Sequence, residues 1–521
     1  MSTDLHRLGT HSELLLNSLR RFPHREAFKQ GDLSWTYRET EARLARFVRV
    51  LQQSGLGRGQ GLGVLSPNRP EVWLCQAGAG LAGGRYTALH PMGSFGDHEY
   101  AVNEAELRVI CVDPAYEDRA GELLEACPSV EAVLTFGRAR VGQDANALSE
   151  AVGATSIDAG PNGPEDTSWL LYTGGTTGVP KAAMLPEAAV AQMALSVSSG
   201  WDLPKHRRYL ACAPITHAAG MLITPTLLFG GTVVLQSSFD PARWLSELAQ
   251  ERATLALLVP TMIYAVLDHP DLDDTDFSAL ESILYGASPM SPARLIEGIE
   301  RIGPVFAQLY GQTECAGIAT SLWREHHDVD RLDRLASCGV PMPGARVEVL
   351  DEEGQALPPG EAGEICVQGP TVMRGYFKQP ELTAETIRDG WLHTGDMAVR
   401  DDEGFLTIVD RKKDMIVSGG FNVFPREIED VLSMDSSVSA VAVIGVPDDK
   451  WGEAVKAIVV PRPGETIQEA TLISLVKEHK GPVYAPKSID VVDALSPTAV
   501  GKPDKKVLRA QYWSDAKRGV N

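Results

Sequence analysis

The sequence lacks the features that mark secreted, membrane-spanning and nucleic-acid-binding proteins. Its first residues are polar, without a basic segment followed by an apolar stretch. No run of about 18 apolar residues occurs along the chain. The 48 Lys and Arg residues are outnumbered by 69 Asp and Glu, and the net charge of −21 argues against nucleic acid as a partner. We therefore expect a soluble, cytoplasmic protein without a membrane span.

Cysteine is also scarce. The seven cysteines are scattered, and none has the spacing of a metal knuckle or of a C-x-x-C pair. The sequence therefore predicts reduced thiols that are mostly buried, rather than a disulfide framework or a cysteine-based metal site.

The length and the charge distribution indicate more than one domain. A chain of 521 residues is too long for one ordinary core. Residues 411–521 hold 16 basic and 15 acidic residues, a net charge of +1, whereas the rest of the chain carries −22. We therefore predict an N-terminal domain over 1–410 and a C-terminal domain over 411–521.

The hydrophobic pattern of the N-terminal half predicts an α/β fold with largely parallel sheets. Apolar residues recur at helical spacing over 37–54, a second helix is expected at 70–83, and short apolar runs at 61–65 and 108–112 are typical of buried strands. The same alternation returns over 208–300.

After about residue 340 the pattern becomes rich in short strands and turns. A strand beginning at Val347 with a turn at 351–354, and further strands at 363–369 and 405–409, predict a β-rich subdomain over about 340–410. The charged residues 410–414 are typical of an exposed linker. Beyond them we expect an α+β domain whose first helix begins at Pro425, with strands at 438–445, 454–460 and 488–492 and a helix at 466–479.

Residues 172–181, Tyr-Thr-Gly-Gly-Thr-Thr-Gly-Val-Pro-Lys, have the composition of a polyphosphate-binding loop. The loop follows a predicted strand ending at Tyr172, which is where α/β sheets bind ligands. Glycines allow backbone N–H groups to approach phosphate oxygens, threonines add hydroxyl donors, and Lys181 adds a positive charge. The loop is not a Walker A motif, because Pro180 precedes the lysine and no Gly-Lys-Ser/Thr follows. A mobile surface turn is the alternative.

Five further motifs follow in order: Gln308-Leu-Tyr-Gly-Gln-Thr-Glu314, Trp391-Leu-His-Thr-Gly-Asp396, Asp410-Arg-Lys-Lys-Asp414, Ser418-Gly-Gly-Phe-Asn-Val-Phe-Pro425 and Pro497-Thr-Ala-Val-Gly-Lys502. Together with the loop, they resemble the adenylate-forming (ANL) superfamily, which includes acyl-CoA synthetases, peptide-synthetase adenylation domains and luciferase. The resemblance covers residues from about 12 to 511.

This resemblance implies two parallel β/α subdomains and a β-rich subdomain, followed by a small, mobile α+β domain. It also implies a reaction: a carboxylate attacks the α-phosphorus of ATP to give acyl-AMP and pyrophosphate, and the thiol of CoA then attacks the acyl-AMP. ATP, Mg²⁺ and CoA are the expected cofactors, and a small carboxylic acid is the expected partner.

The resemblance also assigns roles around the nucleotide. The β- and γ-phosphates would be held by Thr173, Gly174, Gly175, Thr176, Thr177, Gly178 and Lys181. The adenosine would be held by Gly286, Ala287, Ser288, Tyr310 and Gly311, with Asp396 and Arg411 on the ribose. Thr313 would donate to phosphate, and Glu314 would ligate Mg²⁺, a hard cation that prefers carboxylate oxygens. A core tyrosine at 310 and ordinary turn or surface roles for Asp396 and Arg411 are the alternatives.

The resemblance places the acyl group beside His217, which would gate the pocket; a structural histidine is the alternative. Among the other predicted pocket residues, Ala218 and Gly220 are small and Met221 and Met262 are flexible, which suits a sizeable hydrophobic acid. Tyr285 is also assigned to the pocket. The pattern does not separate fatty, aryl and polycyclic acids.

In the C-terminal domain the resemblance assigns Lys502 to the adenylation step, where it would neutralise the carboxylate and the α-phosphate. Lys413 would be the hinge about which the domain rotates, bringing Gly419 and Gly420 to the tunnel for the CoA thiol. By themselves, both lysines read as solvated surface residues.

Three functions remain open at the level of sequence. The first is an acyl-CoA ligase. The second is an adenylating enzyme that passes acyl-AMP to a carrier protein or a separate thiolating enzyme, and the third is a catalytically inactive acyl-nucleotide-binding protein. The presence of both Glu314 and Lys502 argues against the third. A homodimer is neither required nor excluded.

Overall fold

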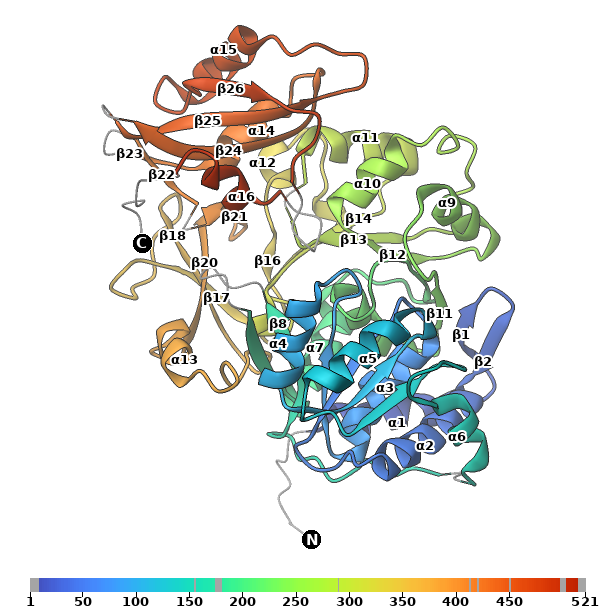
Figure 1. Ribbon diagram of the computed structural model, residues 1–521. Helices are drawn as coiled ribbons and strands as arrows, with labels where there is room; N and C mark the ends of the chain where they lie inside the picture. Colours follow the sequence, from blue (N-terminus) through green and yellow to red (C-terminus); the bar gives the residue numbers. More distant parts are fainter. Residues whose placement is uncertain are drawn as a thin grey trace.

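The computed structural model describes residues 9–153, 156–173, 180–288, 290–411, 414–418, 421–448, 451–496 and 503–513. Within these residues the strands form four sheets. Figure 1 shows the C-terminal residues, orange to red, at one end of the molecule and the blue N-terminal residues at the other. In the described part of the chain, no helix is both long and apolar enough to cross a membrane.

The first sheet has seven strands in the order β7-β6-β5-β3-β4-β8-β9, parallel except for the β8–β9 hairpin. Its strands are β3 (Gly61–Leu65), β4 (Arg85–Ala88), β5 (Leu107–Val112), β6 (Ala132–Thr135), β7 (Gln143–Asp144), β8 (Thr167–Thr173) and β9 (Lys181–Pro186). The helices of this region are α1 (His11–Arg21), α2 (Tyr37–Gln53), α3 (Pro70–Ala82), α4 (Phe95–Glu104), α5 (Glu117–Ala126) and α6 (Ala145–Ala151).

The second sheet has nine strands in the order β16-β15-β14-β13-β12-β10-β11-β1-β2, with a parallel centre and antiparallel edges. Its strands are β1 (Glu26–Gln30), β2 (Leu33–Thr36), β10 (Arg208–Ala211), β11 (Thr232–Leu235), β12 (Leu255–Leu258), β13 (Ser282–Gly286), β14 (Phe306–Tyr310), β15 (Thr320–Leu322) and β16 (Val340–Pro341). Its helices are α7 (Glu187–Gly200), α8 (Ile223–Leu228), α9 (Pro241–Gln250), α10 (Pro260–Leu267), α11 (Pro292–Ile302) and α12 (Leu332–Leu335).

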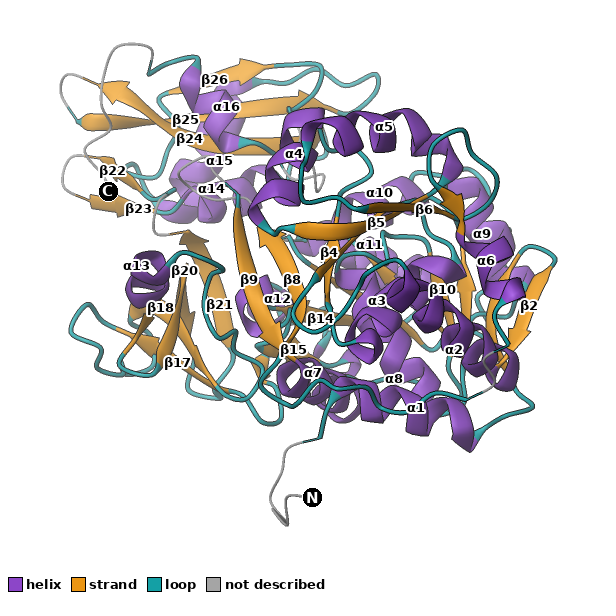
Figure 2. Ribbon diagram, turned by 60° about the horizontal axis from the view of Figure 1, so that its bottom comes forward, coloured by secondary structure: helices purple, strands orange, loops and turns teal. Residues whose placement is uncertain are grey.

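Local sequence signals explain several of these helices. Thr36 and Glu39 form a capping box at the start of α2, with Thr36 N donating to the Glu39 carboxylate at 2.7 Å. Every residue of α3 is buried, as expected for a helix without a polar face. Helices α1, α3, α7 and α8 pack side by side (Figure 2). Their apolar side chains share one large core with residues of both sheets.

The third and fourth sheets have five strands each. The third comprises β17 (Arg346–Leu350), β18 (Ala362–Gln368), β19 (Ile387–Arg388), β20 (Trp391–Arg400) and β21 (Leu406–Arg411), with α13 (Pro380–Thr386) beside it. The fourth comprises β22 (Ile416–Ser418), β23 (Phe421–Val423), β24 (Val438–Asp448), β25 (Gly452–Pro461) and β26 (Ser488–Val491). The last helices are α14 (Pro425–Leu432), α15 (Glu469–Lys480) and α16 (Lys505–Ala510).

The α/β class, the β-rich region and the predicted elements of both halves are confirmed, and all seven cysteines are buried and form no disulfide. The prediction of an exposed linker at 410–414 is wrong in two respects. Strand β21 continues to Arg411 because it pairs with β20, and Asp414 is buried against Arg509, with oxygen and nitrogen 2.8 Å apart. The domain boundary at 410/411 stays a prediction.

We expect Phe306→Ala to reduce the free energy of unfolding by about 3–5 kcal/mol, because it removes a fully buried ring and leaves a cavity. Gly298 of α11 lies against this ring, and a Cβ there would be 2.8 Å from Phe306 Cζ. Denaturant unfolding of the purified protein measures the change. Leu195→Ala, at a position 46% exposed, is the control and should shift the midpoint little; equal shifts would contradict the assignment of Phe306 to the core.

Candidate functional site

The predicted phosphate loop connects the two strands of a hairpin. Thr173, the last residue of β8, pairs with Lys181, the first residue of β9. The Thr173 hydroxyl donates to the Lys181 carbonyl at 3.5 Å. The intervening Gly174, Gly175, Thr176, Thr177 and Gly178 lie outside the described residues. Both ends of the loop are therefore fixed by strand pairing.

Lys181 lies in a chain of polar contacts with Tyr376 and Glu314. Its ammonium group donates to the Tyr376 hydroxyl and lies 4.2 Å from the centre of that ring and 3.5 Å from Glu314 Oε1. The Tyr376 hydroxyl in turn donates to Glu314 Oε1 at 2.7 Å. Burial and the neighbouring Glu314 raise the pKa of Tyr376, so its phenol stays protonated as a donor. The chain brings together a cation, a phenol and a carboxylate from three distant segments.

Backbone pairing explains how these segments meet. Residues 373–377 run against β9: Met184 N donates to Gly375 O at 3.0 Å and Phe377 N donates to Ala182 O at 2.8 Å. At the other end of the segment, Met373 N donates to the backbone carbonyl of Glu314 at 2.8 Å. The segment therefore anchors the Glu314 turn to the strand that carries Lys181.

The Glu314 carboxylate fits the requirements of a Mg²⁺ ligand. It lies at the short 3₁₀ helix η3 (Thr313–Cys315) and is 9% exposed. Both of its contacts use Oε1, and within the described residues Oε2 receives none. A single carboxylate with an available oxygen suits Mg²⁺, which is bound through one or two carboxylates together with substrate phosphates.

A second polar group surrounds Asp396 on β20. Tyr310 Oη donates to Asp396 Oδ2 at 2.7 Å, and Gln312 Nε2 donates to the same oxygen at 2.8 Å. Gln312 Nε2 also donates to the carbonyl of Thr394 at 2.8 Å. Burial, followed by the charge of Asp396, raises the pKa of Tyr310. The ribose and adenine residues predicted from the sequence therefore touch one another, although they are 86 residues apart.

The predicted adenine-side residues lie at the carboxyl ends of neighbouring parallel strands. Strand β13 ends at Gly286 and β14 ends at Tyr310, and the two strands pair through Gly286 and Leu309. A Cβ at Gly286 would lie 2.3 Å from the Leu309 carbonyl, so only glycine fits there. Ala287 has a φ of 63°, an uncommon conformation for a residue with a side chain, and this turn leaves Ala287 exposed and Ser288 half-buried.

Glycines also shape the turn that carries Glu314. A Cβ at Gly311 would lie 2.4 Å from the backbone of Gly317, and a Cβ at Gly317 would lie 2.4 Å from Met221 Sδ. The turn therefore closes tightly on itself and packs against a residue of the predicted acyl pocket. The nucleotide side and the acyl side of the site are direct neighbours.

On the acyl side, the surroundings of His217 determine its charge. Water reaches its side chain, yet surrounding protein atoms, and secondly the nearby His90, lower its pKa to about 4. The His217 ring is therefore uncharged at neutral pH. Next to it, Gly220 lies so close to the Ile215 carbonyl that a Cβ would be 2.1 Å from that oxygen.

The other predicted pocket residues divide into two groups. Ala218 and Met262 are half-buried, and Met221 is buried against Gly317. Tyr285 differs from the expectation: its side chain is fully buried in a second core cluster, with its hydroxyl 3.0 Å from His327 Nε2. Alternation along β13 directs Tyr285 to the face opposite Leu284, which belongs to the core cluster that contains Met221. Tyr285 therefore offers no surface to a ligand in this structure.

Most of the residues predicted to act from the C-terminal region lie outside the part of the chain that the structure describes. Lys413, Gly419, Gly420 and Lys502 lie outside the described residues. The backbone of Arg411 pairs with Asp396 across β20 and β21, but its side chain lies outside the described part as well. Their roles stay predictions.

Sequence reasoning missed three residues of this site. Tyr376 links Lys181 to Glu314, Gln312 holds Asp396, and Glu364 Oε1 accepts from Gly395 N at 2.8 Å beside Asp396. Gln312 lies within a recognised motif and could have been proposed. Tyr376 and Glu364 could not, because their partners are distant in sequence.

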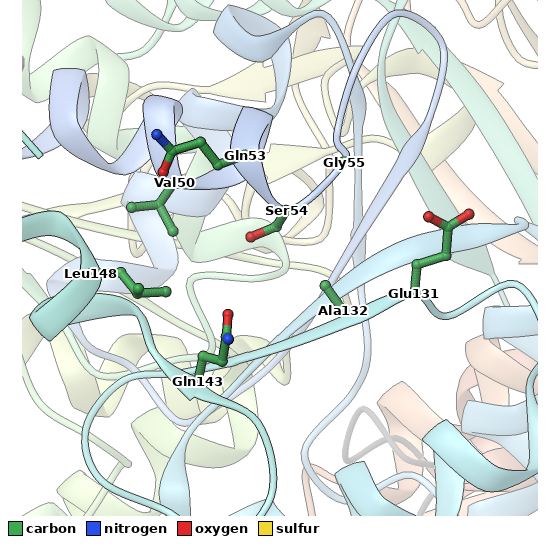
Figure 3. A pocket seen from close by; sticks show the side chains of 8 residues that line it. All are labelled: Val50, Gln53, Ser54, Gly55, Glu131, Ala132, Gln143 and Leu148. Atoms are coloured by element: carbon green, nitrogen blue, oxygen red, sulfur yellow. The ribbon is translucent and has the colours of Figure 1, made fainter.

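A surface pocket of about 380 Å³ lies elsewhere, between α2 and the β6–β7 region (Figure 3). It is lined by Val50, Gln53, Ser54, Gly55, Glu131, Ala132, Gln143 and Leu148. None of these is a predicted site residue, and Glu131 is the single ionisable group among them. Its polar side chains are those of Gln53, Ser54, Glu131 and Gln143, and none of the recognised motifs contributes to it.

Comparison with protein families identifies the family to which the chain belongs. The AMP-binding enzyme family matches residues 15–377, and the C-terminal domain of AMP-binding enzymes matches residues 427–502. The chain belongs to the AMP-binding enzyme family.

Relatives with stated activities place this AMP-binding enzyme in the acyl-CoA synthetase branch of the adenylate-forming superfamily. It is 43% identical to a medium/long-chain fatty-acid–CoA ligase of Mycobacterium tuberculosis, over 100% of this chain and 93% of the relative. It is 38% identical to a feruloyl-CoA synthase of an Amycolatopsis species, over 94% and 96%. The family resemblance drawn from the motifs is confirmed.

A solved structure supports the fold. The amide bond synthetase McbA from Marinactinospora thermotolerans superposes with a TM-score of 0.89 at 31% identity, covering 96% of this chain and 100% of that protein. The arrangement of the four sheets is therefore that of an AMP-binding enzyme.

We expect Tyr376→Phe to lower the rate of acid-dependent ATP consumption by about 10- to 100-fold, which corresponds to losing hydrogen bonds to two charged groups. The Tyr376 hydroxyl is the bridge between Lys181 and Glu314. Stopped-flow or coupled measurement of pyrophosphate release gives the rate. Tyr116→Phe is the control, since Tyr116 lies in a surface 3₁₀ turn; equal rates for the two variants would contradict the bridging role.

Proposed function

We propose that this enzyme activates a hydrophobic carboxylic acid with ATP and transfers the acyl group to CoA. In the first step a carboxylate oxygen bonds to the α-phosphorus, the bond to the β-phosphate oxygen breaks, and pyrophosphate leaves. In the second step the CoA thiol attacks the acyl carbon and AMP leaves. The observation that carries the proposal is the Lys181–Tyr376–Glu314 chain at the base of the 174–179 loop, in a chain whose relatives are acyl-CoA ligases.

Lys181 and the loop residues would hold the β- and γ-phosphates. Lys181 is 22% exposed and already oriented by Tyr376, so little reorganisation is needed when phosphate binds. Thr173 lies at the loop entrance. We assign the remaining phosphate donors to Gly174, Gly175, Thr176, Thr177 and Gly178.

Glu314 would hold Mg²⁺ through Oε2, with Thr313 as a donor to phosphate beside it. When bound there, Mg²⁺ would draw charge from the leaving pyrophosphate. Tyr376 and Lys181 fix the Glu314 carboxylate in one orientation, through a hydrogen bond at 2.7 Å and an ion pair at 3.5 Å.

Asp396 would accept from the ribose hydroxyls. Its Oδ2 is taken by Tyr310 and Gln312, which fix the carboxylate plane. The strand ends at Gly286, Ala287 and Ser288 on one side and at Tyr310 and Gly311 on the other would border the base. This placement follows the rule that ligands bind at the carboxyl ends of parallel strands.

The acid would lie between His217 and Met221, with Ala218, Gly220 and Met262 around it. An uncharged His217 can hydrogen-bond the carboxylate without cancelling the negative charge that attacks phosphorus. Medium- and long-chain fatty acids and ferulate, the acids of the two relatives, define the substrate class that we propose: apolar acids with an extended chain or an aromatic ring.

The C-terminal region would complete each step in turn. We assign Lys502 to the carboxylate and α-phosphate during adenylation, Arg411 to the ribose, Lys413 to the hinge, and Gly419 and Gly420 to the thiol tunnel. These roles rest on the motifs and on the match of residues 427–502 to the C-terminal domain of the family.

Transfer of the acyl group to an acceptor other than CoA is the main alternative to this proposal. The structural similarity to an amide bond synthetase raises an amine as the acceptor in place of CoA. A carrier protein or a separate thiolating enzyme would serve the same chemistry. A cytoplasmic location and a homodimer stay predictions.

Mass spectrometry of quenched reactions tests the proposal. Each reaction contains the enzyme, Mg-ATP and a mixture of fatty, aryl and polycyclic acids, with CoA, with an amine panel, or with neither. We expect acyl-CoA for one class of acid when CoA is present. Acyl-AMP that accumulates unchanged by CoA would overturn CoA as the acceptor, and amide products would identify the amine alternative.

We expect Lys502→Ala to reduce acid-dependent pyrophosphate release by about 100-fold or more, because a charge that stabilises the transition state is lost. The rate at which CoA attacks supplied acyl-AMP should stay close to that of the wild-type enzyme. Lys506→Ala, an exposed lysine of α16, is the matched control. Equal loss of both half-reactions in Lys502→Ala would contradict the assignment of Lys502 to adenylation.

A further inference from the structure

The segment from Leu89 to Glu104 borders the site, although none of the recognised motifs includes it. It begins at the carboxyl end of β4 and continues into α4. The Tyr100 hydroxyl donates to the carbonyl of Pro180 at 3.2 Å, directly after the phosphate loop, and the Tyr172 hydroxyl donates to Glu104. Helix α4 is therefore fixed against β8 and the end of the phosphate loop.

The other end of the segment reaches the acyl side. The ring centres of His90 and His217 are 5.0 Å apart, with the planes at 75°, an edge-to-face contact. His90 follows β4 of the seven-stranded sheet and His217 follows β10 of the nine-stranded sheet. The two histidines therefore meet where the strand ends of the two sheets face each other.

The tautomer of His90 follows from its contacts. Met92 N donates to His90 Nδ1 at 3.1 Å, and since a backbone amide can only donate, Nδ1 carries a lone pair. Burial lowers the pKa of His90, so the ring is neutral at neutral pH. A neutral ring with a lone pair on Nδ1 carries its proton on Nε2. His90 therefore presents an N–H donor on the edge away from its own backbone.

A relay of two side chains, Arg119 and the buried His98, holds the backbone of His90. Arg119 Nη1 lies 2.9 Å from His98 Nδ1, and because a guanidinium can only donate, His98 carries its proton on Nε2. His98 Nε2 then donates to the His90 carbonyl at 2.7 Å. His98 is 3% exposed, and a Cβ at Gly93 would lie 2.6 Å from its Nε2, so the turn after His90 closes directly over this ring.

The position of this relay is informative, because the turn itself is on the surface. Met92 is 84% exposed, so the turn gains little from apolar burial. The buried His98, which Arg119 holds, nevertheless donates to the backbone carbonyl of His90, the residue whose ring contacts His217. Such support is expected where the orientation of a side chain matters.

We propose that His90 is a positioning residue for the ligase reaction: its Nε2–H edge fixes the ring of His217 so that His217 meets the acid substrate in one orientation. The role rests on the proposed function and extends it to a residue outside the recognised motifs. His98 and Arg119 position His90 in turn. Two neutral rings orient the carboxylate without pairing it with a positive charge, which preserves its ability to attack phosphorus.

His90→Phe tests the proposal, because it keeps a ring in place but removes both ring nitrogens, the Nε2–H donor and the Nδ1 acceptor of the surface turn. In acid-dependent pyrophosphate–ATP exchange with a substrate acid, we expect KM for the acid to rise about 10-fold while KM for ATP and the unfolding temperature stay unchanged. His90→Gln, whose side-chain amide can place an N–H donor near the position of the histidine Nε2, should restore most of the loss. His206→Ala, at an exposed histidine in the same half of the molecule, is the matched control.

A double-mutant cycle with His217→Ala separates positioning from packing. If His90 acts through His217, the double variant is no worse than His217→Ala alone. Effects that multiply, or a His90→Phe enzyme with an unchanged KM for the acid, would overturn the role of His90 and leave the proposed function standing. A wild-type protein without acid-dependent exchange would overturn the proposed function, and this inference with it.

Discussion

The contact among Lys181, Tyr376 and Glu314 is the constraint on which the rest of the site depends. It joins the hairpin that carries the phosphate loop to the turn that carries the predicted Mg²⁺ ligand, through a segment between β18 and β19, two strands of the third sheet. A partly buried lysine and carboxylate are stable in this position only because each has a partner. The same partners give both groups the orientation that a polyphosphate with its metal ion requires.

Around this contact, the fold brings together the carboxyl ends of β13 and β14, the middle of β20, and the segments that follow β4 and β10. Strands β13 and β14 deliver Gly286 and Tyr310, β20 delivers Asp396, and β4 and β10 deliver His90 and His217. The tight turn from Gly311 to Gly317 connects the nucleotide side to the acyl side. Strand geometry therefore determines the distances in the site, and the glycines permit the close approaches between its parts.

The sequence predicts the α/β class, the β-rich region and most elements well, because buried strands and amphipathic helices have strong local patterns. It fails where the partner is distant. Asp414 is charged and looks like a linker residue, yet Arg509 pairs with it in a buried position. Tyr285 is predicted to line the acyl pocket, yet strand alternation directs it into the opposite core. Nothing in the sequence around Tyr376 indicates that it belongs to the site.

Exchange of labelled pyrophosphate into ATP, measured with a substrate acid but without CoA, is the most direct test of a two-step ligase built on this site. The structure predicts exchange that requires the acid, continues without CoA and is lost when Glu314 is replaced by glutamine. Exchange that requires CoA would mean that no acyl-AMP forms on its own, and exchange without any acid would mean that the carboxylate is not the attacking group. Either result would contradict the two-step reaction.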